Sequence, residues 1–356
     1  MLRTVRHYSK VINIKDKGEK AARVITSEFA KLKDHYDAPK YPIVLCHGFS
    51  GFDRLGLFPL PNLLEDATAT TKTKEITERS LIELDYWYGI KDALENLGST
   101  VFIAKVPAFG DIRSRAISLD KFIEKQCKAL RQTESKSSIY NKPNSSNDDT
   151  TTFKDKHQPI KVNLISHSMG GLDSRYLISR IHNDNENYRV ASLTTILTPH
   201  HGSECADFIA DLIGDNGVLK KVCPPSIYQL TTLHMKKFNE VVKDDPSVQY
   251  FSFGARFNPR WYNLFGLTWL VMKYQIEKEQ ADRFKHMIDN DGLVSVESSK
   301  WGQYIGTLDE VDHLDLINWT NRARSVFDKV MFAQNPNFNP IALYLEIADL
   351  LSKKGL

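Results

Sequence analysis

A serine between small residues stands where an apolar segment gives way to a helical pattern. The segment 160–167 is rich in β-branched residues and predicts a buried strand, while the apolar residues of 172–181 recur with helical spacing. A strand that turns at once into a helix holds the residue at the turn, here Ser168, above the sheet with the helix N-terminus directed at it. The usual pattern is G-x-S-x-G, whereas residues 166–170 read Ser-His-Ser-Met-Gly, with serine at the first small position. We predict that Ser168 is a nucleophile; the alternative is an ordinary strand–turn–helix with an exposed serine.

A serine nucleophile needs a base, and the base needs a carboxylate that orients it. When the serine stands at such a turn, the acid and then the histidine follow it in the chain. His313 comes shortly after the last expected strand, at 304–308, and is preferred for that reason. The competing histidines, none of which follows a late strand, are His182, His200, His201, His234 and His286. Asp291 stands in an Asn-Asp-Gly turn that can hold a carboxylate in a fixed place, with Asp289 as the alternative acid and a plain turn as the other interpretation.

The oxyanion that develops in acyl transfer needs two hydrogen-bond donors. One is expected to be the backbone N–H of Met169, directly after the nucleophile, and the other comes from the loop after an early strand, here 42–46. That loop begins His47-Gly48-Phe49, so we assign the second donor to the N–H of Phe49, with Gly48 permitting the unusual backbone. Loss of one such donor typically costs about 3 kcal/mol of transition-state stabilisation.

Composition indicates a globular chain with a sizeable core. The 356 residues are 41% hydrophobic and 26% charged, which allows one large α/β domain or two small ones. The net charge of +3 is close to balance and does not indicate nucleic-acid binding. The four cysteines lack C-x-x-C spacing, so free thiols are expected and a structural zinc site is not, although Cys205 and Cys223 could form a bridge. The most apolar stretch, 261–274, is interrupted by polar residues and is shorter than the ~18 residues of a membrane span.

Strands alternate with helices along the chain, which predicts a mostly parallel central sheet with helices on both faces. Beyond those above, we expect strands at 101–106, 193–197 and 249–254, and helices at 86–97, 119–130, 261–285, 322–332 and 341–352. We divide the chain into a basic N-terminal segment with a lead-in helix (1–40, the helix within 16–38), a catalytic domain (41–333) and a C-terminal helix packed on it (334–356). Residues 134–157 are polar and predict a disordered insertion, and the helical cap is expected at about 205–243 and 261–280.

The first ten residues are basic and contain no acid, which is typical of a mitochondrial transit peptide. The alternative interpretation is a frayed basic terminus.

Six stretches in fixed order make the sequence similar to a known family. The stretches are 41–53, 85–90, 162–176, 198–203, 290–294 and 313–318. Together they resemble the true lipases of the α/β-hydrolase fold, of the bacterial Pseudomonas type, and above all their fungal relatives, the yeast mitochondrial triacylglycerol lipase group. The resemblance implies Ser168, Asp291 and His313 as the catalytic triad.

The resemblance also implies hydrolysis of tri- and diacylglycerols at a lipid surface, with contact to a membrane or lipid droplet. It implies a mitochondrial location, with the cytoplasm or a lipid droplet as alternatives, and no cofactor. The bacterial relatives hold calcium with an Asp two residues after the catalytic histidine and a Gln four residues further on. Here Asp315 is present but Trp319 offers no oxygen ligand, so no metal is expected. The alternative functions are a phospholipase, a lipid acyltransferase, or a non-catalytic relative that binds lipid or a protein partner.

Overall fold

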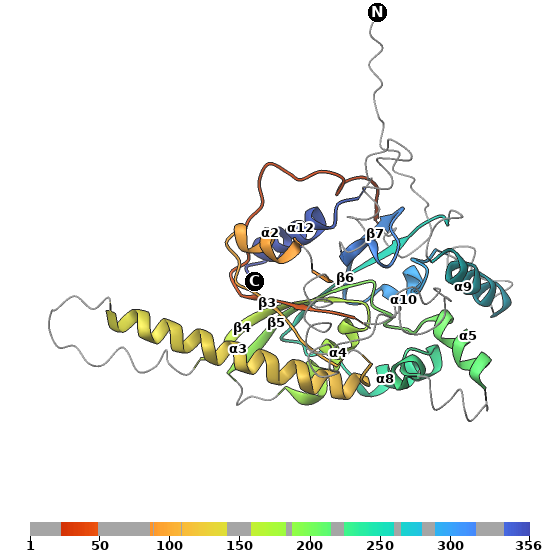
Figure 1. The fold of residues 1–356 in the computed structure, drawn as a ribbon, viewed down its shortest axis with the longest axis horizontal. Helices are drawn as coiled ribbons and strands as arrows, with labels where there is room; N and C mark the ends of the chain where they lie inside the picture. Colours follow the sequence, from red (N-terminus) through yellow and green to blue (C-terminus); the bar gives the residue numbers. More distant parts are fainter. Residues whose placement is uncertain are drawn as a thin grey trace, which may run out of the picture.

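A computed structural model gives the architecture of the chain (Figure 1). It describes residues 23–48, 86–87, 89–107, 109–140, 158–182, 187–214, 224–259, 265–279, 289–317 and 338–356. For residues 134–140 it describes the backbone alone. Several predictions fall outside these ranges: the oxyanion donor Phe49, the basic segment 1–10, residues 141–157, Cys223, His286, the helix 322–332 and Trp319.

The centre of the protein is a sheet of seven strands, all parallel, in the order β1-β7-β6-β5-β4-β2-β3. The strands are β1 (Val24–Ile25), β2 (Ile43–Cys46), β3 (Val101–Ile103), β4 (Ile160–His167), β5 (Tyr188–Ile196), β6 (Gln249–Arg256) and β7 (Gln303–Asp309). The predicted parallel α/β sheet is therefore confirmed. The strand that precedes Ser168, β4, lies inside the sheet between β5 and β2.

Alternate residues of β2 show how the two faces of the sheet are covered. Ile43 and Leu45 belong to an apolar cluster that includes residues of α2 (Ile90–Asn96) and α12 (Pro340–Lys353). Val44 and Cys46 belong to a second cluster, which includes residues of α3 (Ile112–Tyr140). Because successive side chains of a strand point to opposite faces, a fully apolar strand is buried from both sides. In Figure 1, α2 and α12 cover one face, and α3 and α4 (Gly170–Tyr176) cover the other.

The remaining helices lie after the nucleophile in the chain. They are the π-helix η2 (Leu177–Ile181), α5 (Glu204–Ile213), α7 (Pro225–Gln229), α8 (Thr232–Val241), α9 (Gly266–Glu279), α10 (Val296–Ser299) and the 3₁₀ turn η3 (Asp315–Ile317). Helices α5 and α9 pack against each other at one end of the molecule (Figure 1). No helix in the described ranges combines the length and the apolar character that a bilayer crossing requires.

Four expectations about the elements are corrected. The lead-in helix is wrong for residues 23–40, which contain no helix: Val24 and Ile25 pair with Thr307 and Leu308 of β7 and add an edge strand. The β-branched Ile25 is buried there, and burial outweighs the helical composition of its charged neighbours. Helix α3 continues to Tyr140, so the first seven residues of the predicted insertion are helical. Strand β5 begins at Tyr188, five residues earlier than expected, and β3 ends at Ile103, three residues earlier.

Candidate active site

Ser168 occupies a sharp turn between β4 and α4. Its φ of 56° lies in the left-handed region, which is unfavourable for a residue with a side chain. Two bonds hold this conformation: the N–H of Ser168 donates to the carbonyl of Ile196 at 2.9 Å, and the Thr198 hydroxyl donates to the carbonyl of Ser168 at 2.7 Å. A Cβ at Gly170 would lie 2.7 Å from the carbonyl oxygen of Cys46, so this position of the motif has no room for a side chain.

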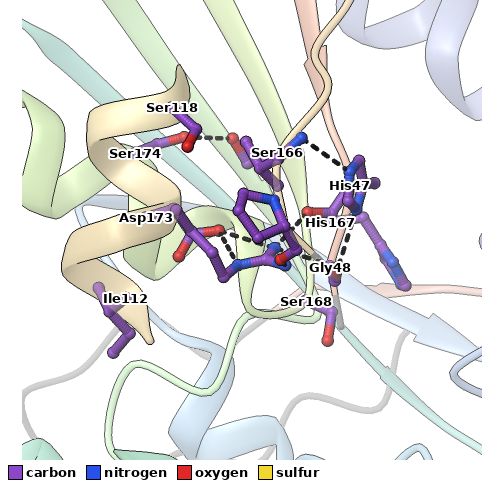
Figure 2. A network of polar contacts seen from close by, with 12 residues as sticks. His47, Gly48, Ile112, Ser118, Ser166, His167, Ser168, Asp173 and Ser174 are labelled. Atoms are coloured by element: carbon purple, nitrogen blue, oxygen red, sulfur yellow. Dashed lines mark hydrogen bonds and ion pairs between the residues drawn. The ribbon is translucent and has the colours of Figure 1, made fainter. Parts of the chain in front are cut away.

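The serine at the first small position of the motif is accommodated by a hydrogen bond. Ser166 is fully buried, and its hydroxyl lies 2.8 Å from the hydroxyl of Ser174 on α4 (Figure 2). A buried hydroxyl without a partner would be destabilising, and this pair satisfies both groups. Serine in place of the first glycine of G-x-S-x-G therefore still allows β4 and α4 to pack closely.

The three residues predicted as a triad lie in hydrogen-bond contact. His313 Nε2 is 2.9 Å from Ser168 Oγ, and His313 Nδ1 is 2.8 Å from Asp291 Oδ2. The other carboxylate oxygen of Asp291 accepts the backbone N–H groups of Leu293 at 2.9 Å and Val294 at 2.7 Å. The turn therefore fixes Asp291 and leaves one oxygen for the imidazole. This is the arrangement in which a histidine can remove the proton of a serine hydroxyl.

The alternative residues lie elsewhere. Asp289 forms an ion pair with Arg256 at 2.6 Å and is half exposed. His200 is buried between Arg175 and Thr195, with nitrogen contacts of 3.3 and 3.0 Å. No described competitor of His313 forms a hydrogen bond with Ser168, and His286 lies outside the ranges given above.

A buried arginine connects the segments around the nucleophile. Arg115, on α3, donates to the carbonyls of His47 at 2.9 Å, Gly48 at 3.1 Å and Pro107 at 2.8 Å. It also pairs with Asp173 of α4 at 2.8 Å (Figure 2). Burial raises the pKa of Asp173, and the adjacent cation acts in the opposite direction. One guanidinium thus joins the loop after β2, the loop after β3 and the helix that follows Ser168.

A second polar link involves the residue before the nucleophile. The Tyr86 hydroxyl lies 2.7 Å from Nδ1 of His167 and accepts the N–H of Gly48 at 2.9 Å. The rings of His167 and His313 are 4.9 Å apart between centroids. Burial lowers the pKa of His167 well below its usual value, so this second histidine is neutral beside the first.

The two predicted oxyanion donors are described in part. Met169 is fully buried at the start of α4, and within the described residues its N–H has no hydrogen-bond acceptor. Gly48 lies against the nucleophile, because a Cβ there would be 2.6 Å from Ser168 Cβ and 3.1 Å from Ser168 Oγ. The N–H assigned to Phe49 lies outside the described ranges. Among the described residues, therefore, one of the two predicted donors has an N–H without an acceptor, next to the serine.

Sequence reasoning missed Arg115, Asp173, Tyr86 and His167. Arg115 and Asp173 lie 58 positions apart in the chain, and no local pattern indicates that they pair. Tyr86 and His167 fall inside stretches that resemble the lipase family, but the sequence gives these two side chains no role. Their contacts are long-range, which a single sequence does not reveal.

The carboxylates beside His313 are used within the chain. Asp315 Oδ2 accepts the N–H of Asp312, and Asp312 Oδ1 accepts the N–H of Leu314, both at 3.0 Å. In the described part of the protein, no group of three or more His, Cys, Asp or Glu side chains is placed to hold a metal ion. Trp319 is outside that part, so the absence of calcium stays a prediction.

The cysteines that the structure describes are free. Cys46, Cys127 and Cys205 are buried thiols. Cys223 lies outside the described ranges, so the alternative bridge between Cys205 and Cys223 stays a prediction. Burial raises the pKa of all three thiols to about 12, which keeps them protonated and unreactive.

We expect the protein to lose stability steeply on mild acidification. Burial lowers the pKa of His47 to about 4 and those of His167 and His200 well below their usual value. Between about pH 6.5 and pH 4 the unfolded chain binds protons at these positions and the folded chain does not, so the free energy of unfolding falls as pH falls. At up to about 1.4 kcal/mol per pH unit each, the three histidines lose on the order of 5 kcal/mol between pH 7 and pH 5. Burial raises the pKa of Asp173 to about 7, so this carboxyl takes up a proton in the folded chain over the same range and offsets about 2 kcal/mol. A net loss on the order of 3 kcal/mol is therefore expected.

Urea unfolding at pH 7, 6 and 5 measures this loss. The control is His35→Gln, which removes a histidine whose side chain is 80% exposed. Its free energy of unfolding should change with pH as much as that of wild type. An unfolding free energy that stays constant over this range would contradict the assignment of neutral, buried histidines.

Comparison with known proteins agrees with the fold. The sequence profile of the alpha/beta hydrolase fold matches residues 41–214. The chain is 39% identical over 358 residues to triacylglycerol lipase 2 of Saccharomyces cerevisiae, covering 95% of this chain and 99% of the relative. It is 27% identical over 360 residues to a triacylglycerol lipase of Vibrio cholerae, covering 93% and 94%. EstA from Clostridium botulinum shares the fold, with a TM-score of 0.51, 18% identity and coverage of 93% and 95%. The chain therefore belongs to the α/β hydrolase fold family, in the group that contains these triacylglycerol lipases.

Proposed function

We propose that the protein is a triacylglycerol lipase, a serine ester hydrolase that cleaves the carboxylic ester bonds of tri- and diacylglycerols. The observation that carries the proposal is the hydrogen-bonded series Ser168–His313–Asp291 at a strand-to-helix turn. It occurs in a chain that aligns over nearly its whole length with a triacylglycerol lipase.

The contacts support a two-step mechanism. His313 Nε2 takes the proton of Ser168 as Oγ attacks the ester carbonyl, and the same proton then passes to the departing alcohol. Water next attacks the acyl-enzyme with His313 as base, which releases the fatty acid and restores the serine. Asp291 holds Nδ1 and stabilises the imidazolium that forms in each step. The N–H groups of Met169 and Phe49 are the proposed donors to the oxyanion.

A substrate profile of the purified protein tests the proposal. We expect fatty acid release from emulsified triacylglycerol and diacylglycerol, and none from the Ser168→Ala variant. Release from phospholipid alone, or transfer of the acyl group to an added alcohol in preference to water, would favour a phospholipase or an acyltransferase instead. A wild-type protein that neither hydrolyses esters nor reacts with a fluorophosphonate would favour the non-catalytic alternative.

An exposed apolar face supports action at a lipid surface, within the region where a cap was expected. Helices α5 and α9 pack together over an apolar cluster that includes Cys205, Phe265 and Met272. Their outer sides expose large apolar residues: Phe208, Leu212, Leu267, Leu270 and Tyr274. Large apolar side chains gathered on two adjacent helices are typical of a surface that meets another apolar surface. We propose that this α5–α9 face contacts the lipid phase, a membrane or a droplet, during hydrolysis.

Charge on the α5–α9 face should separate insoluble from soluble substrates. Leu212 is 70% exposed and Leu267 is 62% exposed, so Leu212→Asp with Leu267→Asp leaves the core intact. We expect activity on emulsified triacylglycerol to fall at least tenfold, because placing carboxylates against lipid is unfavourable. The rate on soluble p-nitrophenyl butyrate should change less than twofold. Trp269 is a poorer site for this test, because it is only partly exposed and packs on the apolar cluster below.

The matched control is Leu32→Asp, which changes a leucine that is 54% exposed outside α5 and α9. It should affect neither substrate. Equal losses on both substrates would indicate damage to the fold, and no loss on the emulsion would remove the lipid-contact role of this face.

We also propose a mitochondrial location, with the cytoplasm and lipid droplets as alternatives. Its support is the basic composition of the first ten residues, which contain no acid. Residues 1–40 fused to a fluorescent protein should accumulate in mitochondria. A diffuse cytosolic signal would contradict this location.

A further inference from the structure

One tyrosine hydroxyl lies between the loop after β2 and the residue that precedes the nucleophile. The Tyr86 hydroxyl accepts the N–H of Gly48 at 2.9 Å and lies 2.7 Å from Nδ1 of His167. Burial raises the pKa of Tyr86 and lowers that of His167, so the phenol keeps its proton and the imidazole is neutral. The phenol has one proton and already accepts from Gly48, and we assign that proton to the bond with Nδ1 of His167.

The first bond of Tyr86 acts on the loop that lies against the nucleophile. Both ends of the peptide unit between His47 and Gly48 are held, the N–H by Tyr86 and the carbonyl by Arg115 at 2.9 Å. A Cβ at Gly48 would be only 3.1 Å from Ser168 Oγ, so a rotation of this peptide unit changes the surroundings of the reacting oxygen. Without the phenol, the Gly48 N–H loses its acceptor and the unit is held at one end.

The second bond of Tyr86 acts on a ring beside the catalytic base. The ring of His167 lies 4.9 Å from the ring of His313, tilted by 48°. The bond to Tyr86 holds Nδ1 of this ring, and the main chain of His313 lies against the ring as well. The orientation of His167 in turn shapes the space in which His313 turns toward Ser168.

We propose that Tyr86 is a positioning residue for ester hydrolysis: its hydroxyl fixes Gly48 beside Ser168 and His167 beside His313. The inference rests on the proposed reaction at Ser168 and adds a residue to it. Tyr86 contacts no reacting atom, so its effect passes through the geometry of its two partners. Because both partners lie beside the reacting groups Ser168 and His313, the loss should appear in kcat and not in KM.

The test is Tyr86→Phe, which removes the hydroxyl and keeps the ring. We expect kcat on p-nitrophenyl butyrate to fall on the order of 10- to 100-fold, with KM within twofold of wild type. Reaction of Ser168 with a fluorophosphonate should slow by a similar factor, because the phosphonyl oxygen occupies the oxyanion position.

Tyr344→Phe is the matched control. Tyr344 is fully buried, its hydroxyl has no hydrogen-bond partner among the described residues, and its ring is 5.6 Å from that of Trp87, which is 5.0 Å from that of Tyr86. This variant makes the same chemical change in the same aromatic cluster without breaking a bond. Its kcat and its labelling rate should stay within twofold of wild type.

Two variants of His167 test the same bond from the other side. In His167→Asn the amide oxygen can accept the Tyr86 hydroxyl, whereas His167→Ala leaves it without a partner. We expect kcat of the Ala variant to be on the order of tenfold lower than that of the Asn variant. This pair decides the question if Tyr86→Phe is insoluble.

The outcomes separate this role from the reaction on which it depends. The positioning role would be overturned by full activity of Tyr86→Phe, or by a change in its KM without a change in kcat. It would also be overturned by an equal loss of kcat in Tyr344→Phe, or by equal losses of kcat in the two His167 variants. In all of these cases wild type still hydrolyses the ester. A wild-type protein inert toward both ester and fluorophosphonate would overturn the proposed function first, and the role of Tyr86 with it.

Discussion

Ser168→Ala should abolish ester hydrolysis, with a loss on the order of 10⁶ in kcat. The hydroxyl forms the covalent bond to the acyl group, and the backbone presents it 2.9 Å from His313 Nε2. Alanine is no less suited than serine to the left-handed backbone, and the bonds that hold the turn go to the main chain of residue 168, so the variant removes the nucleophile without changing the turn. The measurement is the rate of p-nitrophenyl butyrate hydrolysis by the purified variant, with its folding checked by circular dichroism.

Labelling with a fluorophosphonate provides the second readout. Wild type should be modified once, at Ser168, and the variant should not react. Serines 166 and 174 act as internal controls, because both are fully buried and hydrogen-bonded to each other. A folded Ser168→Ala protein that retains more than a small fraction of activity would place the nucleophile elsewhere.

His313→Ala should be as damaging as Ser168→Ala, and the double variant hardly worse than either. The serine attacks only when the histidine accepts its proton, so removal of one group makes the other ineffective. If the two groups contributed independently, kcat of the double variant would fall by a factor on the order of 10¹² and become unmeasurable. If they act as one catalytic unit, kcat falls by a factor of about 10⁶ in each of the three variants. The measurement is kcat for the two single variants and the double variant on one soluble ester.

The carboxylates near residue 290 supply a matched pair for the same experiment. Asp291→Ala should cost on the order of 10⁴ in kcat, because it removes the partner of His313 Nδ1. Asp289→Ala should cost little, since this side chain faces Arg256 and is half exposed. A larger loss for Asp289→Ala would make the assignment of the acid wrong.

The fold could be predicted from the sequence wherever burial is periodic and local. The apolar runs of β2, β4 and β6 indicate strands buried from both sides, and alternation with helices predicts a parallel sheet. The two-residue strand β1 escapes this reasoning, because Val24 and Ile25 sit among charged residues and become a strand only by pairing with β7. The extension of α3 to Tyr140 escapes it for the opposite reason, since polar helical residues carry no apolar period.

At the site, the residues that could be predicted are those whose positions follow from chain order and turn chemistry. Ser168, Asp291 and His313 follow the order that a strand-to-helix turn implies, and they meet in the structure. Arg115 and Tyr86 could not be predicted in this way. Their bonds join segments that are distant in the chain, and a single sequence carries no signal for such pairs.

The left-handed backbone of Ser168 also has an evolutionary consequence. A non-glycine residue held at φ 56° carries a conformational penalty of order 1 kcal/mol. The bonds from Ser168 N–H to Ile196 and from Thr198 to Ser168 hold the backbone in this conformation. Glycine would adopt this conformation without that penalty. A duplicated copy of the protein released from selection for catalysis would therefore gain stability from glycine at this position, so drift and the demands of folding act together against the nucleophile. Selection for hydrolysis is what maintains a serine at a turn that folding alone would assign to glycine.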